Sequence, residues 1–302
     1  SIFHGSSVFG TLLAAAAGAF VVGNPALGDS AWRWGFAIGV VPACLTLFVR
    51  WKLKEPDQWV RAREQGKADR EQRTGQLLHL FHSEYLRNTF VGVSLASIGL
   101  VTFWGGHIYG KDALLRHAQQ RVLIEEGVEA GASKEAKQTA WENNEPELKR
   151  AEMLSMVLNT IGGGLGLVLF GAISNRLGRK GAFIFYHAIA FVMMILLFKV
   201  LIPSGASAVV LAITLPIFGF FTLGMHAGYA VYFPELYPTR LRGTGAGFCF
   251  NMGRLATAAA FLTFFVFPVT NESKALILSP LYLVGCAVVL LGRETRDKEL
   301  PE

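Results

Sequence analysis

Charged residues are scarce in this sequence, and cysteines are scarcer still. Asp, Glu, Lys and Arg make up 17% of the 302 residues, whereas hydrophobic residues make up 52%. Length alone would suggest about two soluble domains, but this composition argues against a soluble protein. The cysteines, Cys44, Cys249 and Cys286, each lie inside an apolar run without metal-ligand spacing. They indicate buried, inert thiols and imply no disulfide framework.

Signatures of enzymes and of nucleotide-driven pumps are also missing. The sequence contains no Gly-rich phosphate loop ending in Gly-Lys-Ser/Thr, no His/Glu zinc spacing and no Gly-x-Ser-x-Gly elbow. We therefore expect neither an enzyme nor an ATP-driven pump, and no cofactor. The net charge is +6. Because this charge falls in loops between apolar runs, it indicates membrane-surface loops and not a nucleic-acid partner.

Long apolar runs dominate what is present. A helix that crosses a bilayer needs about 20 mostly apolar residues. The sequence contains enough such runs to predict an all-α, polytopic membrane protein embedded in a lipid bilayer, with about eight transmembrane helices. The predicted spans are residues 3–23, 33–51, 88–109, 153–174, 182–202, 207–232, 244–267 and 275–292.

The loops between these spans indicate an orientation. One set of loops carries many Lys and Arg residues. The opposite short loops, 24–31, 203–206 and 268–274, contain a single basic residue, Lys274. Loops rich in Lys and Arg stay in the cytoplasm. We therefore expect the basic side, and both ends of this chain, to be cytoplasmic. The basic set comprises Arg176, Arg179 and Lys180, then Arg240 and Arg242, and last Arg293, Arg296 and Lys298.

A long insert, residues 110–152, falls on the other side. Apolar residues from Leu114 to Leu123 recur at helical spacing, and Gly127 is placed to end that helix. Ser133 is placed to cap a second short helix, and Pro146 suits the first turn of a third. Three roles remain open for this insert: a lid, a docking site for a partner, or a solvated segment without a role in function.

The polar segment 52–87 divides the chain unequally. Residues 1–51 hold two predicted spans, residues 88–292 hold six, and residues 293–302 form a tail. Many transporters are built from two six-span halves. We therefore expect residues 88–292 to be one complete half and residues 1–51 to be the last two spans of another.

Three motifs lie where spans meet the membrane surface. In the first, Gly178 permits a tight turn between two spans, and its basic neighbours suit an anionic surface. In the second, two prolines stop a helix, and Glu235 can pair with a loop arginine. The third comprises residues 32–42 and 54–59. The first two motifs consist of Gly171, Asn175, Arg176, Gly178, Arg179 and Lys180, and of Pro234, Glu235, Pro238, Arg240, Arg242 and Gly243.

These motifs resemble the signatures of the major facilitator superfamily, in particular its sugar- and organic-acid:proton symporter branches. The resemblance covers nearly the whole chain apart from the insert. Asn175 replaces the family's Asp, so an Asp–Arg gating pair would be lost at this loop, and Asp57 and Gln58 replace the family's Ser-Pro. The resemblance aligns the eight spans with the family's fifth to twelfth, so we expect four further spans before Ser1.

The resemblance also implies a function and a location. A member of this family is expected to be a monomeric secondary transporter of the plasma (inner) membrane that works by alternating access. The proton gradient would supply the energy. Three readings remain open: a carrier of a small organic anion, a porter of sugar or another neutral solute, and a membrane sensor or scaffold that transports nothing.

Polar residues inside the spans are candidates for the substrate site, because ionisable groups in a membrane are costly. Arg254 ranks first. It lies in the middle of the seventh span in an Asn-x-Gly-Arg string resembling those of organic-acid carriers, and no Asp or Glu lies deep in the other spans. A structural ion pair is the alternative role. His107, His226 and His4 could carry a proton, and Trp104, Asn159, Tyr229 and Asn251 could line a central cavity.

Overall fold

The computed structural model describes residues 7–22, 24–69, 73–129, 131–267, 269–298 and 301. Over these ranges the regular elements are helices, and no strand occurs. The chain divides into two compact units, one of residues 6–74 and one comprising the rest. The division falls within the predicted linker 52–87. His4 lies outside the described residues.

The smaller unit consists of short helices. α2 (Ser7–Ala17) continues as the π-helix η1 (Gly18–Val22), and Asn24 caps the 3₁₀-helix η2 (Pro25–Ser30) by accepting from the amide of Ala26 at 3.0 Å. The chain then turns back through α3 (Ala31–Ile38) and α4 (Val40–Lys52). The predicted linker is partly helical, because α5 covers Asp57–Ala68.

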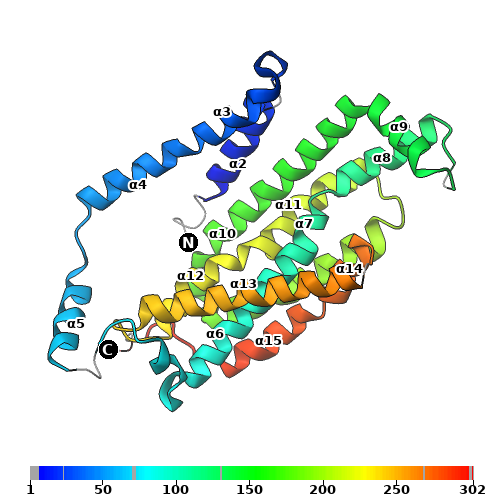
Figure 1. The fold of residues 1–302 in the computed structure, drawn as a ribbon. Helices are drawn as coiled ribbons and strands as arrows, with labels where there is room; N and C mark the ends of the chain where they lie inside the picture. Colours follow the sequence, from blue (N-terminus) through cyan, green and yellow to red (C-terminus); the bar gives the residue numbers. More distant parts are fainter. Residues whose placement is uncertain are drawn as a thin grey trace. The chain divides into compact units, whose positions relative to one another are not determined.

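The larger unit is a bundle of long helices (Figure 1). α6, α10, α11, α13 and α15 run side by side in it. Its elements are η3 (Leu77–Phe81), α6 (Ser83–Thr102), η4 (Phe103–His107), α7 (Ile108–Gly110), α8 (Ala113–Glu125), α9 (Lys134–Asn143), α10 (Glu145–Ile195), η5 (Leu196–Leu201), α11 (Ala208–Gly224), α12 (His226–Glu235), α13 (Arg242–Val266), α14 (Asn271–Leu278) and α15 (Leu281–Leu291).

Glycines set the closest helix crossings in this bundle. A Cβ at Gly162 would strike the backbone of Pro216, and a Cβ at Gly166 would strike the backbone of Phe220, so α10 and α11 touch backbone to backbone. A Cβ at Gly253 of α13 would lie 2.7 Å from the carbonyl carbon of Ala96 in α6. Membrane helices rely on such small residues, since van der Waals contact replaces the hydrophobic effect between them.

The insert folds as predicted from its local signals. Gly127, with φ of +65°, follows the end of α8, and Ser133 accepts from the amide of Ala136 at 3.2 Å to cap α9. Pro146 lies in the first turn of α10. Ala118, Val122, Ala140 and Leu148 form a small core of their own within the insert.

Six helical stretches of the described chain are long and apolar enough to cross a membrane. One of them, Glu145–Leu201, contains two predicted spans, because the left-handed backbone of Gly178 (φ +79°) breaks it in the middle. The first predicted span, 3–23, is described as helix over residues 7–22 only. The chain is therefore a multi-pass helical membrane protein, and its described helices follow the predicted spans.

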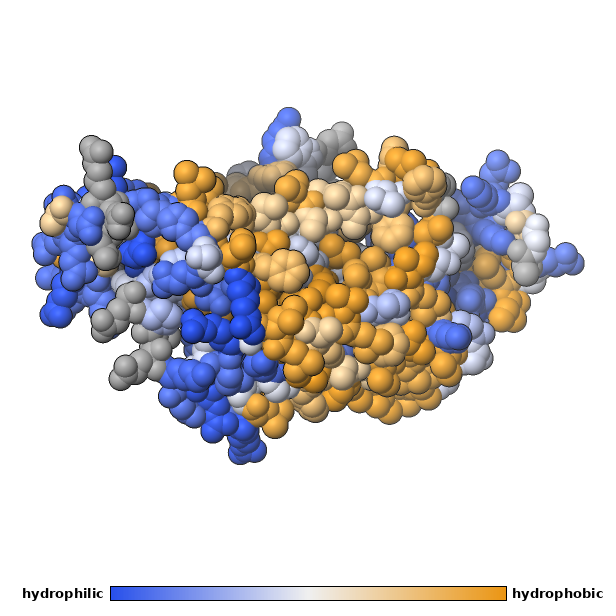
Figure 2. Space-filling view, turned by 90° about the horizontal axis from the view of Figure 1, so that it is seen from below, coloured by the Kyte–Doolittle hydropathy of each residue, from blue (hydrophilic) through white to orange (hydrophobic). Residues whose placement is uncertain are grey.

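The surface agrees with this assignment. Figure 2 shows a broad hydrophobic area with hydrophilic residues gathered toward both ends. Large apolar side chains stay exposed along the bundle, such as Leu165, Val168 and Ile213, as lipid contact requires. We call the end with the Gly178 turn, Pro238–Arg242 and residues 293–298 the basic end, and the opposite end, with α8 and α9, the insert end.

Candidate functional site

Two helices lose their regular geometry in the middle of the bundle. α6 passes into the π-helix η4, and the helix that begins as α11 is interrupted at Met225 before α12 starts at His226. Single π turns and broken membrane helices often mark functional sites. Both irregularities present a predicted site residue, since His107 ends η4 and His226 begins α12.

His107 is buried and hydrogen-bonded through both ring nitrogens. Its Nδ1 lies 2.6 Å from Oγ1 of Thr222, and its Nε2 lies 3.1 Å from Nδ2 of Asn159. Thr222 Oγ1 also lies 2.6 Å from the carbonyl oxygen of Phe218. Both short contacts are satisfied when Thr222 donates to Phe218 and accepts from Nδ1–H of His107. Nε2 then accepts from Asn159, so the ring is neutral in this arrangement.

Aromatic contacts join His107 to the other candidates. The ring of Phe103 stacks on His107 with centroids 4.7 Å apart and meets His226 edge-on at 5.1 Å. His226 contacts Tyr229 at 5.3 Å, and Tyr229 contacts Phe250 at 6.5 Å. This continuous series, which runs from Asn159 through His107, Phe103, His226, Tyr229 and Phe250, is called the central string below. Its members come from α6–η4, α10, α12 and α13.

Arg254 stands at the end of the central string. Its guanidinium lies 5.1 Å from the centre of the Phe250 ring, and its Nη1 is 3.4 Å from Oδ1 of Asn251. Arg254 is exposed on the larger unit, and among the described residues it takes part in no ion pair. The Arg254 cation thus lies beside a series of polar and aromatic groups, without a carboxylate partner among the described residues.

The predicted candidates therefore lie in one region, with a buried part and an exposed part. Asn159, His107, His226 and Tyr229 are buried, whereas Trp104, Asn251 and Arg254 are exposed. Trp104 joins the group through an edge contact with Phe103 at 5.5 Å. Sequence reasoning missed Thr222, Phe103 and Phe250, because no local pattern shows that they meet the histidines and Arg254.

The basic end carries a second polar cluster. Nη2 of Arg179 lies 2.9 Å from Oε1 of Glu235, and its Nε lies 3.1 Å from Oε2. The side chains of this bidentate pair are only 15% and 16% exposed. The predicted pairing of Glu235 with a loop arginine is therefore present. Arg179 also donates to Asn175 Oδ1 at 3.0 Å, so the Asn that replaces the family's Asp still binds it.

The tail after α15 completes this cluster, a contribution the sequence analysis missed. The carboxylate of Glu294 accepts from the backbone amides of Arg179, Lys180, Thr295 and Arg296. Burial alone would raise the pKa of Glu294, but these four amides together hold it below its ordinary value. The tail, residues 293–302, mixes acidic and basic residues, so no local pattern singles out Glu294.

Glu294 also explains the turn residue. A Cβ on Gly178 would lie 2.7 Å from Oε2 of Glu294, and the φ of +79° disfavours any other residue. Thr295 Oγ1 donates to Glu235 Oε2 at 2.5 Å, so the tail contacts both members of the cluster.

The other motif residues have separate places. Lys180 donates to the carbonyl of Leu290, and the carbonyl of Arg176 accepts from Arg296. Arg240 contacts His79 Nδ1 at 3.0 Å. Two glycines of the motifs have minor roles: the carbonyl of Gly171 accepts from Ser174, and a Cβ on Gly243 would meet open space. Arg242 begins α13.

Within the described ranges no three His, Cys, Asp or Glu side chains could hold a metal ion.

Comparison with known proteins gives several relatives of low identity. The chain is 26% identical over 226 residues to the probable 4-methylmuconolactone transporter of Cupriavidus pinatubonensis, covering 75% of this chain and 44% of the relative. It is 23% identical to the sialic acid transporter NanX of Escherichia coli, with shares of 76% and 47%. It is 24% identical to the cis,cis-muconate transport protein of Acinetobacter baylyi, with shares of 84% and 55%.

The chain thus spans about half the length of the curated relatives it matches. These relatives are named as transporters and not as enzymes, in agreement with the sequence analysis. The family model of the Major Facilitator Superfamily matches residues 1–261, which include the first six predicted spans, most of the seventh and all three surface motifs. The chain therefore belongs to the major facilitator superfamily.

Proposed function

We propose that the protein is a secondary active transporter that carries a small organic anion by alternating access, in symport with protons. Arg254 is the observation that carries this proposal. A guanidinium in the middle of a membrane helix requires a counter-charge, and none of the described carboxylates supplies one. A carboxylate substrate supplies it by a bidentate, charge-assisted contact.

The names of the relatives support the same substrate class. Muconate and sialic acid are carboxylates, and two of the relatives are named for transporting them. A neutral sugar remains the alternative substrate, because the Pro-Glu motif at residues 234–235 is shared with sugar carriers. A neutral solute, however, leaves Arg254 without a counter-charge.

The central string offers a place for the coupling proton. In the arrangement described above, His107 is neutral and Oδ1 of Asn159 has no hydrogen-bond partner among the described residues. Rotation of the Asn159 amide by half a turn presents Oδ1 to Nε2, which can then hold a proton. His226, linked to His107 through Phe103, is the second candidate.

The basic end is proposed as the cytoplasmic gate. The Arg179–Glu235 pair and the Glu294 contacts join the α10 turn, α12 and the tail. Breaking and re-forming such a cluster suits the rocking of two halves about a central site. We propose further that the protein is a monomer in the plasma (inner) membrane, with the basic end in the cytoplasm, and that it uses the proton gradient and no cofactor.

The proposal is tested by uptake of radiolabelled cis,cis-muconate into liposomes that contain the full-length protein and carry an inward proton gradient. Arg254→Gln is expected to lower uptake at least about thirtyfold, since losing a charge-assisted partner costs ~2 kcal/mol or more. Arg254→Lys keeps the charge but not the fork geometry, and is expected to retain a measurable part of the uptake.

Folding is checked by thermal unfolding in detergent. Because Arg254 is exposed and takes part in no ion pair with another described residue, both variants are expected to unfold at the wild-type temperature. Uptake by Arg254→Gln at the wild-type rate would contradict the role of Arg254. If hexoses accumulate and carboxylates do not, the neutral-solute alternative holds. If no solute accumulates with the gradient, the protein is a sensor or scaffold.

A further inference from the structure

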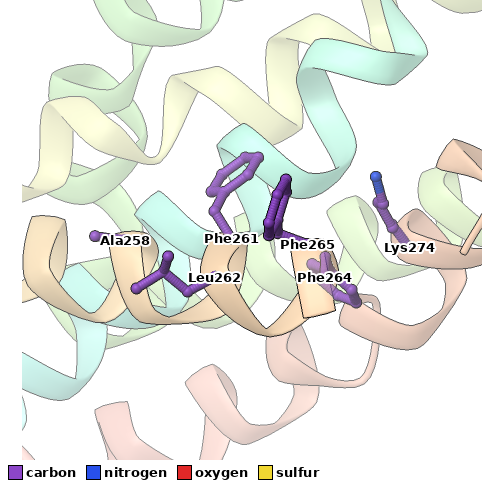
Figure 3. Close-up of a pocket in the computed structure, with 6 residues that line it drawn as sticks. All are labelled: Ala258, Phe261, Leu262, Phe264, Phe265 and Lys274. Carbon is purple, nitrogen blue, oxygen red and sulfur yellow. The ribbon is translucent and has the colours of Figure 1, made fainter. Parts of the chain in front are cut away.

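A cavity of about 780 Å³, open along one side, lies beside the last turns of α13, toward the insert end. Its lining is exposed, since Leu262 is 67% and Phe265 85% exposed. It is lined by Ala258, Phe261, Leu262, Phe264, Phe265 and Lys274 (Figure 3). Five of these residues are apolar, and Lys274 supplies the one charged group. The volume of this cavity falls within the range of roughly 300–1,000 Å³ that is usual for sites that bind small molecules.

The cavity follows the same face of α13 as Arg254. Residues 254, 258, 261 and 265 are spaced by four, three and four positions, so they form one stripe along the helix. In Figure 3 the rings of Phe261 and Phe265 and the side chain of Lys274 point to the same side. At 1.5 Å per residue, Phe265 stands about 16 Å beyond Arg254. A small molecule in the cavity is therefore in line with Arg254.

Lys274 is held by rings and not by a carboxylate. Its Nζ lies 5.6 Å from the centre of the Tyr109 ring, 6.0 Å from that of Phe264 and 3.4 Å from Oδ1 of Asn271. Such contacts fix an ammonium group but leave its charge available.

The nearest acidic residue in the sequence is already engaged. Glu272, two positions before Lys274, is ion-paired with Arg116 of α8, whose side chain is only 18% exposed. The insert thus holds the carboxylate that could otherwise have neutralised Lys274. Among the described residues Lys274 takes part in no ion pair.

We propose that this cavity is a second anion site, which binds a carboxylate attached to an aromatic or conjugated body before the molecule reaches Arg254. Lys274 binds the carboxylate, and Phe261, Phe264 and Phe265 contact the unsaturated body through their faces and edges. The placement before Arg254 rests on the proposed function, whereas binding at Lys274 does not.

This chemistry selects among ligands of one shape. Benzoate satisfies both the ammonium and the rings. Benzyl alcohol has the same ring but leaves the ammonium without a counter-charge, and benzylamine is repelled by it. A cavity that offered only apolar contacts would bind benzyl alcohol at least as well as benzoate. Without a charged partner, burying the carboxylate of benzoate costs more free energy than burying the hydroxyl of benzyl alcohol.

The test measures how benzoate protects a thiol in the cavity. Leu262, 67% exposed, is replaced by Cys in the full-length protein, and labelling by a methanethiosulfonate reagent is followed at position 262 by mass spectrometry. Benzoate is expected to slow labelling at least about threefold, and benzyl alcohol and benzylamine are not. Adding Lys274→Gln or Lys274→Met is expected to raise the half-protecting benzoate concentration about tenfold, as loss of one charge-assisted contact implies.

Lys149→Gln is the matched control. Lys149 is an exposed lysine near the insert end, paired with Glu145 and outside the cavity lining, so protection should stay at the wild-type level. Equal protection by benzoate and benzyl alcohol in the protein with native Lys274 would overturn the proposal, as would no protection by either. The comparison of benzoate with benzyl alcohol uses the protein with native Lys274, so its outcome does not depend on whether a Lys274 variant folds.

The order of the two sites is tested with Arg254→Gln. Benzoate is expected to protect position 262 in this variant as well, because Lys274 is intact. If Arg254→Gln transports normally while protection still depends on Lys274, the proposed role of Arg254 fails and the second site stands. If uptake depends on Arg254 but protection is independent of Lys274, the second site fails alone.

Discussion

His107 combines two properties: it is buried, and both ring nitrogens have polar partners. Thr222 and Asn159 fix the orientation of the ring. A lone packed histidine needs only one such partner, as His187 does with the carbonyl of Phe183. The second contact comes from an amide that can present either atom, which is what the proposed protonation of His107 requires.

His107→Gln tests this distinction. A glutamine can keep a donor toward one partner and an acceptor toward the other, but it cannot carry a proton. Gradient-driven accumulation of cis,cis-muconate is expected to be lost, while exchange of labelled for unlabelled substrate across the membrane continues. His117→Gln, in the insert, is the control and should leave both intact. Loss of exchange together with accumulation would point to a role in folding or binding instead.

The Arg179–Glu235 pair differs from the other ion pairs in burial. Arg121 and Glu147 also pair, but their side chains are 53% and 39% exposed. Desolvated, bidentate pairs couple more strongly than exposed ones, which contribute about 0–1 kcal/mol.

A double-mutant cycle should separate the two pairs. Single and double Arg→Gln and Glu→Gln variants are unfolded thermally in detergent. We expect a coupling of about 1–3 kcal/mol for Arg179–Glu235 and below about 1 kcal/mol for Arg121–Glu147. Equal coupling in both pairs would show that the basic-end cluster is ordinary surface electrostatics.

At the scale of elements, the α10–α11 crossing depends on glycine. Gly166→Ala places a methyl group against the backbone of Phe220 and 3.0 Å from Cα of Gly224, neither of which can turn away as a flexible side chain could. We expect a loss of about 1–3 kcal/mol, typical of overpacking. Gly247→Ala, on α13 with open space around it, should be neutral or slightly stabilising. Thermal unfolding of both variants, compared with wild type, measures the difference.

Elements could be predicted where their causes are local. Gly127, Ser133 and Pro146 act on neighbouring residues, and the helices of the insert begin and end as their positions indicate. The π-helix η4 was not predictable, because Gly105 and Gly106 face Leu278 and Met194 from distant helices. The apolar run of residues 88–109 predicts a membrane helix but does not indicate these contacts between distant helices.

The same limit applies to the candidate site. Arg254 stands out in sequence because a charge in an apolar run is conspicuous. Thr222 does not, because its importance comes from lying 2.6 Å from His107, which is 115 positions away in the chain. The Glu294 contacts with the α10 turn likewise join residues far apart in sequence.

At the scale of the larger unit, the two ends differ in how they are closed. The basic end is held by a compact cluster of charged groups around Gly178 and Glu294. The insert end is held by a folded subdomain with its own small core, attached through Arg116–Glu272 and through Ser155, which donates to the carbonyl of Lys111. Such asymmetry is expected if the ends meet different compartments.

The proposed orientation, with the basic end in the cytoplasm, can be measured directly. Lys134→Cys places a thiol on the exposed start of α9, and Lys298→Cys places one on the exposed tail. In intact cells a membrane-impermeant maleimide is expected to label position 134 and to reach position 298 only after permeabilisation, because basic loops stay in the cytoplasm. Mass spectrometry of each position distinguishes them from the native cysteines. The reverse pattern would place the Lys274 cavity on the cytoplasmic side, where it would receive substrate leaving Arg254 instead of substrate arriving.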